Sequence, residues 1–141
     1  MAPTLSLVGP NTAHTGHTKH YTFTTYDPGV DTFAFAAGSP SCGGSALSNA
    51  SIDPGTGAGS FDCTFPNDSA PASYIVSVQV QDSDAVSSNT DSIIVDVTDA
   101  TPPDTSITGG PADASLSNDR NSSFTFTGQD NVTTTGNLTY E

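Results

Sequence analysis

The chain has 141 residues and carries 15 acidic side chains against two basic ones, for a formal net charge of −13 and a pI near 4.1. This charge argues against nucleic acid as a partner, because phosphates need a basic surface, and it disfavours contact with anionic lipid. It favours cations instead.

The composition predicts an all-β protein. Residues that favour helix, such as Glu, Lys, Arg, Leu and Met, are scarce, whereas Thr, Val, Tyr and Phe are plentiful. No segment is long and apolar enough for a membrane span, so we expect no direct membrane insertion. The first residues lack the charged and apolar regions of a signal peptide. We expect a secreted protein, extracellular or at the cell surface, whose signal peptide is not in this chain.

Alternating apolar and polar residues, separated by turn residues, predict about seven strands in the first hundred residues. Tyr21 and Phe23 alternate with polar neighbours, so we expect both aromatic rings to face a core. Residues 38–59 are rich in Gly, Ser and Asn and indicate a long loop or a weak pair of edge strands. The clearest predicted strands are residues 4–8, 19–26, 32–36, 61–65, 73–80 and 90–97. The last two are expected to pair as a hairpin at the centre of one sheet.

Cys42 and Cys63 are the two cysteines of the chain. Neither lies near residues that suggest a metal site or a nucleophile. We predict an intrachain disulfide that closes a Gly-rich loop and stabilises the domain by about 3 kcal/mol, as is common in secreted proteins. Two buried free thiols are the alternative.

The sequence also repeats, with a period of about one hundred residues, the size of a small β-sandwich domain. The segment YTFTTYD at 21–27 returns as FTFTGQD at 124–130, and each copy follows a Gly-Pro turn. We therefore predict a complete domain at 1–99, a semi-rigid linker at 100–104 that contains two prolines, and the N-terminal part of a second repeat at 105–141.

The second repeat holds too little chain to build a two-sheet core. Its apolar side chains would leave an exposed strand edge, unless another chain supplies the missing strands. We expect a truncated or a strand-complemented repeat whose interface residues are Phe124, Phe126, Leu138 and Tyr140. The expected partners are neighbouring repeats or subunits of the same protein.

Several segments resemble PKD-type and related bacterial Ig-like repeats, which are strung along large secreted prokaryotic surface proteins. The segment SYIVSVQVQDSD at 73–84 is similar to the PKD strand that carries Asp residues into a turn, except that Ala85 stands where Gly is usual. The turn at 27–29 matches the Asp-rich turn after the second strand, and the chain has no Trp for a WDFGDG-like segment. The resemblance implies an Ig-like (PKD-like) antiparallel β-sandwich with adhesion, spacing or matrix roles and no chemistry.

Four aspartates in predicted turns are candidate Ca²⁺ ligands: Asp27, Asp31, Asp82 and Asp84. Carboxylates on turns are the oxygen ligands that Ca²⁺ takes, and neighbouring carboxylates gain most from a divalent cation. The alternative is that Asp simply favours turns and solubility. No other cofactor is expected.

Two further patterns leave alternatives open. His14, His17 and His20 have a spacing of three that could suggest zinc, but we expect exposed turn histidines instead, because no Cys or carboxylate accompanies them. Sequons allow glycosylation, which depends on the host. They begin at Asn49, Asn67, Asn121, Asn131 and Asn137.

The motifs of serine hydrolases, phosphate-binding loops and zinc peptidases are missing from the sequence, so we expect no enzyme. We predict a non-catalytic extracellular repeat of a surface, adhesin or filament protein that acts as spacer and self-association scaffold. The alternative is a calcium-dependent module of a secreted enzyme or adhesin that binds a glycan or protein ligand.

Overall fold

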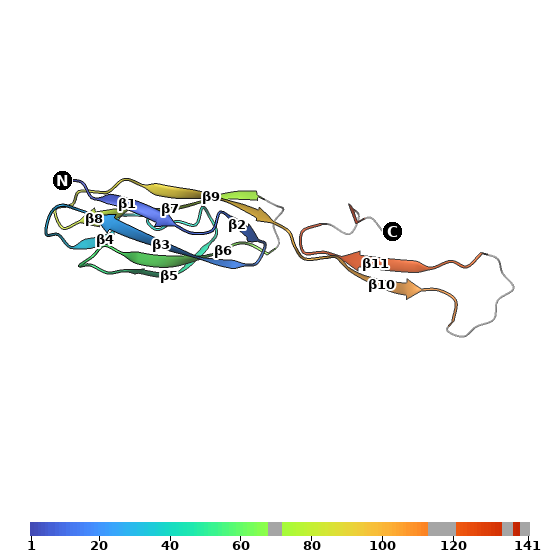
Figure 1. Cartoon of the computed structure of the whole chain (residues 1–141). Coiled ribbons are helices and arrows are strands. Elements are labelled where there is room, and N and C mark those ends of the chain that lie inside the picture. The colour runs from blue at the N-terminus through green and yellow to red at the C-terminus, as the bar shows by residue number, and fades with distance from the viewer. Residues whose placement is uncertain (68–71, 113–120, 134–136, 139–141) are drawn as a thin grey trace. The chain divides into compact units, whose positions relative to one another are not determined.

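The computed structural model describes residues 1–67, 72–112, 121–133 and 137–138, and its regular elements are all β-strands (Figure 1). The all-β class is therefore confirmed. The chain divides into two compact units, Met1–Asp99 and Ala100–Glu141, which are described separately. The described ranges contain no helix of the length and hydropathy needed to cross a membrane.

One sheet of the first unit has four antiparallel strands in the order β1-β3-β6-β5. Its strands are β1 (Thr4–Val8), β3 (Thr18–Tyr26), β6 (Gly59–Thr64) and β5 (Ala46–Ile52). The exposed strand β5 has a bulge between Ser48 and Ser51, and Asn49 takes a positive φ of 51° beside it. The Gly-rich stretch 38–59 thus holds one edge strand.

The facing layer contains the order β2-β9-β7 and the short pair β4-β8. These strands are β2 (Thr12–His14), β9 (Asp91–Thr98), β7 (Ala72–Val78), β4 (Phe33–Phe35) and β8 (Val80–Asp82). The antiparallel β7–β9 pair confirms the predicted pairing of the two strongest strands, and β9 is central. The sequence did not predict β2, which runs parallel to β9, because three residues are too few to show alternation.

The prediction of one straight strand at 73–80 is wrong, because the chain changes partner at Gln79. The amide N–H of Gln79 donates to Ser39 Oγ at 2.7 Å, and the N–H of Val80 donates to Ser88 Oγ at 3.1 Å. Serine hydroxyls from two loops thus satisfy amides that a straight strand would pair in a ladder. The chain leaves β9 after Val78 and pairs with β4 as β8.

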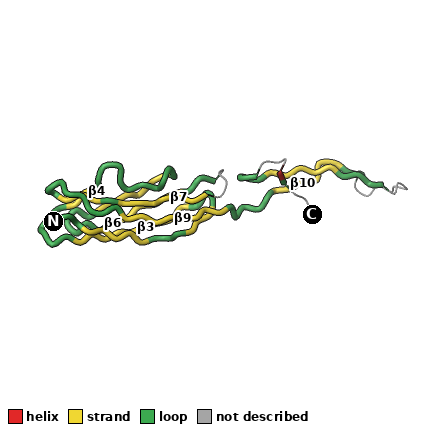
Figure 2. The backbone as a smooth tube through the Cα atoms, turned by 90° about the horizontal axis from the view of Figure 1, so that it is seen from above, coloured by secondary structure: helices red, strands yellow, loops and turns green. Residues whose placement is uncertain are grey.

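The core of the first unit lies between the two layers. Tyr21 and Phe23 are buried, as the alternation of β3 predicts. The Tyr21 ring stacks on Phe61 with centroids 5.5 Å apart, and its hydroxyl donates to the Pro10 carbonyl at 3.2 Å. Figure 2 shows the strands of this unit running along its length, with loops at its ends. The other fully buried large side chains are Phe61, Phe65, Val76, Val78, Val80, Val95 and Cys63.

The free edge of β1 is closed by two side chains that precede or begin β9. Asn89 Oδ1 accepts the Leu5 N–H at 2.8 Å, and its Nδ2 donates to the Leu5 carbonyl at 3.0 Å. Asp91 Oδ2 accepts the Leu7 N–H at 2.8 Å. Together these side chains replace a neighbouring strand, which protects the edge from pairing with other chains.

The second unit contains an antiparallel pair of β10 (Asp104–Gly109) and β11 (Thr125–Gln129). Ile107 pairs with Phe126, as Leu7 pairs with Phe23 in β1–β3. Because Phe126 is the repeat equivalent of Phe23, the two hairpins have the same register up to this pair. The register of β10 then shifts between Ile107 and Gly109, whereas β1 continues without a shift. β10 begins at Asp104, the last residue of the predicted linker.

Candidate functional site

Three loops meet at one end of the first unit and carry the predicted metal ligands. The pairing of β4 with β8 places Phe33 opposite Asp82. The Phe33 N–H donates to the Pro54 carbonyl at 2.9 Å, and Ser83 Oγ donates to Asp31 Oδ1 at 2.9 Å. The loop after β3, the turn after β5 and the loop after β8 are therefore linked by direct hydrogen bonds.

Asp27 and Asp31 converge on the space beside Gly29. A Cβ at Gly29 would meet Asp31 Oδ2 and would lie 3.7 Å from Asp27 Oδ2, so a side chain there would displace the Asp31 carboxylate. Asp27 Oδ2 is enclosed and has no hydrogen-bond partner among the described residues. The two aspartates border an open cavity of about 270 Å³, whose lining includes Tyr26, Val30, Phe33 and Thr56.

Asp82 has a different environment. It is buried, and its Oδ1 accepts the N–H groups of Asp84 at 3.0 Å and Val86 at 2.8 Å, so this oxygen organises the turn after β8. Ala85 in this turn has a φ of 63°. That left-handed conformation favours Gly, which the resemblance leads one to expect here, so the Ala85 side chain stands at a strained backbone position.

The four predicted ligands thus lie at one end of the unit but do not form one metal cluster. Within the described ranges, no group of three or more His, Cys, Asp or Glu side chains is placed to hold an ion. Asp27 and Asp31 come together, and a hydrogen bond from Ser83 links Asp31 to the Asp82–Asp84 turn. The assignment of Asp82 and Asp84 as Ca²⁺ ligands therefore stays a prediction, and in this structure Asp82 Oδ1 accepts two backbone N–H groups.

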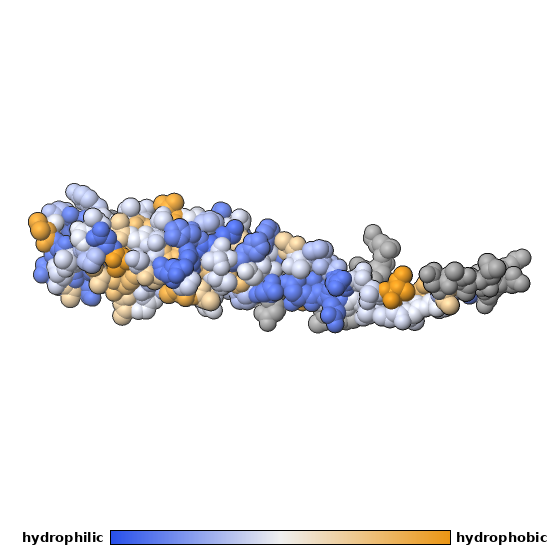
Figure 3. Space-filling model, turned by 90° about the horizontal axis from the view of Figure 1, so that it is seen from below, coloured by the Kyte–Doolittle hydropathy of each residue, from blue (hydrophilic) through white to orange (hydrophobic). Residues whose placement is uncertain are grey.

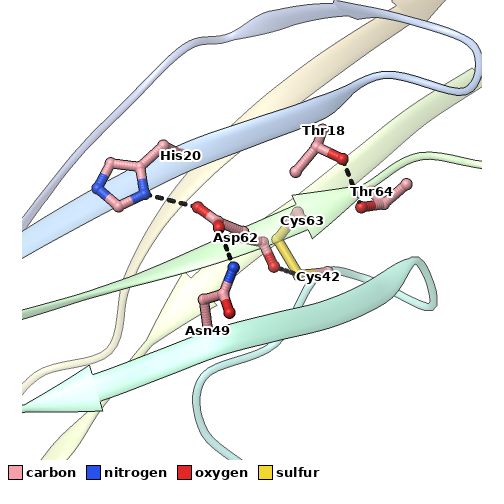
Figure 4. A network of polar contacts seen from close by, with 7 residues as sticks. All are labelled: Thr18, His20, Cys42, Asn49, Asp62, Cys63 and Thr64. Atoms are coloured by element: carbon pink, nitrogen blue, oxygen red, sulfur yellow. Dashed lines mark hydrogen bonds and ion pairs between the residues drawn. A yellow bond between two sulfur atoms is a disulfide. The ribbon is translucent and has the colours of Figure 1, made fainter.

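A polar network crosses three strands on the exposed face of the four-stranded sheet (Figure 4). Asp62 on β6 accepts from Asn49 Nδ2 at 2.7 Å and lies 2.6 Å from His20 Nδ1. The Asn49 hydrogen bond, followed by that of His20, lowers the pKa of Asp62 below its ordinary value of 3.8. This network was not predicted, because it depends on the β3–β6–β5 register and on the positive φ of Asn49.

The predicted disulfide between Cys42 and Cys63 is confirmed, with the two Cα atoms 5.6 Å apart (Figure 4). Both residues are buried. The bond attaches the loop before β5 to β6, the strand that pairs with β3. It therefore supports the centre of the four-stranded sheet.

The histidines do not act together. His20 belongs to the Asp62 network, whereas His14 and His17 face each other edge to face with ring centroids 5.5 Å apart. His14 Nδ1 lies 3.1 Å from Thr98 Oγ1. All three histidines are exposed, as predicted, but His14 belongs to β2 and His20 to β3, so only His17 lies outside a strand.

The predicted interface residues lie in the second unit, and three of the four are within the described ranges. Phe124 and Phe126 are exposed, and Leu138 is half-buried. Tyr140 lies outside the described residues. The surface in Figure 3 is mostly hydrophilic or intermediate, with a few hydrophobic groups. The exposed aromatic pair of the second unit is therefore a candidate contact surface.

No protein-family model and no curated protein matches the chain. Among solved structures, the chain is similar to the PKD domain of an M14-like peptidase from Thermoplasmatales archaeon SCGC AB-540-F20, with a TM-score of 0.54 and 22% sequence identity. The match covers 67% of this chain and 93% of that domain. It confirms a PKD-type, Ig-like β-sandwich fold.

Proposed function

We propose that this chain is a non-catalytic extracellular repeat module that serves as a load-bearing spacer in a surface, adhesin or filament protein. The observation that carries the proposal is the shared register of β1–β3 and β10–β11, since one hairpin built twice is the mark of a tandem array. The disulfide is compatible with an oxidising, extracellular location. Self-association and adhesion are further roles that such an array supports.

The strand order supports the mechanical part of the proposal. The early strand β2 and the last strand β9 of the first unit are hydrogen-bonded in parallel, from Thr12 opposite Asp96 to His14 opposite Thr98. Tension on the two ends of this unit first acts on β1, which precedes β2 and pairs with β3, and it then slides β2 and β9 past each other. All of their hydrogen bonds are loaded together, which resists extension better than opening one bond at a time.

Single-molecule stretching of the full chain from its two ends tests this role. We expect one cooperative unfolding event for the first unit. The force at which this event occurs depends on the unfolding rate of the unit. Reduction should lengthen the released chain by about 70 Å, since the disulfide hides the segment between residues 42 and 63 and an extended residue spans about 3.5 Å. Extension without a distinct event would contradict a load-bearing spacer.

A second candidate function is calcium-dependent ligand binding at the Asp27–Asp31 loop. It is favoured by the enclosed, unpartnered Asp27 Oδ2, and the repeat-equivalent Asp130 also has an enclosed oxygen, Oδ1, without a partner among the described residues. Asp31 supplies a second carboxylate beside Gly29. Carboxylate oxygens suit Ca²⁺, and extracellular modules bind it weakly.

Thermal unfolding with and without Ca²⁺, after EGTA treatment, tests the calcium hypothesis. A site with a Kd of about 10⁻⁴ M would stabilise the fold by about 2.7 kcal/mol in 10 mM Ca²⁺. Asp31→Asn should abolish the gain, whereas Asp84→Asn, at an exposed turn position, should keep it. An unchanged melting temperature in the wild-type chain would exclude the site.

A further inference from the structure

The sequon that begins at Asn49 lies on an exposed edge strand. Asn49, Ala50 and Ser51 belong to β5, which ends the strand order β1-β3-β6-β5, and all three residues are exposed. The register shifts between Ser48 and Ser51, so Asn49 and Ala50 together stand opposite one residue of β6. The φ of 51° at Asn49 is a left-handed conformation that Asn adopts more readily than most residues. The asparagine of the sequon therefore lies in the bulge, outside the regular ladder.

One hydrogen bond orients the Asn49 side chain on the exposed face of the sheet (Figure 4). Its Nδ2 donates to Asp62 Oδ2 at 2.7 Å, and Asp62 Oδ1 lies 2.6 Å from His20 Nδ1. A primary amide nitrogen carries two hydrogens. One of them serves Asp62, so the other can be replaced by a substituent without loss of this hydrogen bond.

Two other sequon asparagines within the described ranges have more crowded amides. A Cβ at Gly16 would lie 2.7 Å from Asn67 Oδ1, so the Asn67 amide packs on the backbone at Gly16. Asn131 Oδ1 is enclosed. Asn49 combines an exposed residue, a position outside the ladder and an oriented Nδ2. These features distinguish Asn49 from Asn67 and Asn131 as an acceptor for a bulky group.

We propose that Asn49 is an N-glycosylation site whose modified amide keeps the hydrogen bond to Asp62. The donor is an oligosaccharide linked to a lipid diphosphate, and a transferase attaches it. Asn49 Nδ2 forms a bond to the anomeric carbon of the first sugar, and the bond from this carbon to the diphosphate breaks. The diphosphate leaves with the electron pair, and Nδ2 gives one proton to a base of the transferase. This inference goes beyond the spacer role and does not depend on it.

Secretion of the full chain from yeast tests the modification. A flexible C-terminal tag with one further sequon reports whether each chain has met the transferase, and glycopeptide mass spectrometry measures the occupancy of both positions. We expect a glycan on Asn49 in most chains whose tag is glycosylated. Ser51→Ala should abolish this glycan, because a sequon needs a hydroxyl at its third position, and Ser51→Thr should keep it. An unmodified Asn49 in chains with a glycosylated tag would overturn the proposal.

Two glycosidases determine whether the modified amide keeps its hydrogen bond. They act on a variant in which Gln replaces the other sequon asparagines. Endoglycosidase H leaves one sugar on Asn49, whereas peptide N-glycosidase F makes the change Asn49→Asp and places a second carboxylate against Asp62. We expect the first product to melt within about 1 °C of the same variant with Ser51→Ala, and the second about 4 °C lower, because a hydrogen bond is lost. Equal melting temperatures of the two products would overturn the proposed hydrogen bond.

Discussion

The hairpins β1–β3 and β10–β11 have the same register from Thr4 to Leu7 and from Asp104 to Ile107, but different surroundings. Leu7 and Phe23 are 7% and 2% exposed, whereas their counterparts Ile107 and Phe126 are 73% and 52% exposed. The first pair is covered by β6, by the facing sheet and by side chains that close its edge. The comparison teaches that local sequence sets the hairpin and its register, while burial depends on strands from elsewhere in the chain.

Truncating the equivalent aromatic residues should give the largest contrast. Phe23→Ala removes a buried ring that contacts Phe35 and Phe61, and it should lower the free energy of unfolding by about 3–5 kcal/mol. Phe126→Ala should change the same transition by less than about 0.5 kcal/mol, because the residue is half exposed and belongs to the other unit. Urea unfolding followed by circular dichroism measures both. Equal losses in the free energy of unfolding for the two variants would contradict the difference in burial between the two hairpins.

Removing the disulfide should have the next largest effect. Cys42 and Cys63 are the two cysteines of the chain, and their disulfide lies within the first unit. The paired change Cys42→Ala with Cys63→Ala should cost the first unit about 3 kcal/mol, because the unfolded chain gains freedom. Urea unfolding of oxidised protein and of the double variant gives the difference. A loss below about 1 kcal/mol would show that β6 holds its place without the bond.

Breaking the closure of the β1 edge should have an intermediate effect. Asn89→Ala removes both hydrogen bonds to Leu5 and should lower the free energy of unfolding by about 1–2 kcal/mol. Thr90→Ala, at the exposed neighbouring position, is the matched control and should change little. Thermal unfolding of the two variants measures the difference. If they are equally stable, the Asn89 side chain does not hold the edge.

The smallest effect should come from the Asp62 network. The folded-state pKa of Asp62 lies below 3.8, so its carboxylate stabilises the fold above that pH, and the contribution is lost as the pH falls through the folded pKa. Asp62→Asn should therefore flatten the fall in melting temperature below pH 4 and leave the pH dependence near neutrality unchanged. Melting temperatures of the wild type and of Asp62→Asn, measured from pH 2 to 7, test this prediction. If both proteins show the same slope of melting temperature against pH below pH 4, the network does not stabilise the fold.

Much of the fold could be predicted from sequence because it depends on local patterns. The alternation of Tyr21 and Phe23 identified β3 and its buried face, and the cysteine pair identified the disulfide. The break at Gln79 could not be predicted, because it depends on Ser39 and Ser88 from distant loops. Short β2 was missed because three residues are too few to show alternation, and its partner β9 lies more than eighty residues away.

The candidate site was less predictable than the fold. Turn composition identified the acidic end of the unit, but not that Asp82 accepts backbone amides while Asp27 keeps an oxygen without a partner in the described ranges. Side-chain direction within a turn depends on its backbone angles, which residue type alone does not specify. The Asn49–Asp62 hydrogen bond could not be predicted for the same reason, because it needs a positive φ at Asn49.

Native-state hydrogen exchange of the full chain tests the central claim most directly. The claim is that β11 pairs with β10 as β3 pairs with β1, whereas no strand in the described part of the chain pairs with β11 as β6 pairs with β3. Amides at 20–23 should exchange only by global unfolding, and the equivalent amides at 123–126 should exchange at least about a thousandfold faster, since little buried structure protects them. Equal protection at the two sets of amides would contradict the account.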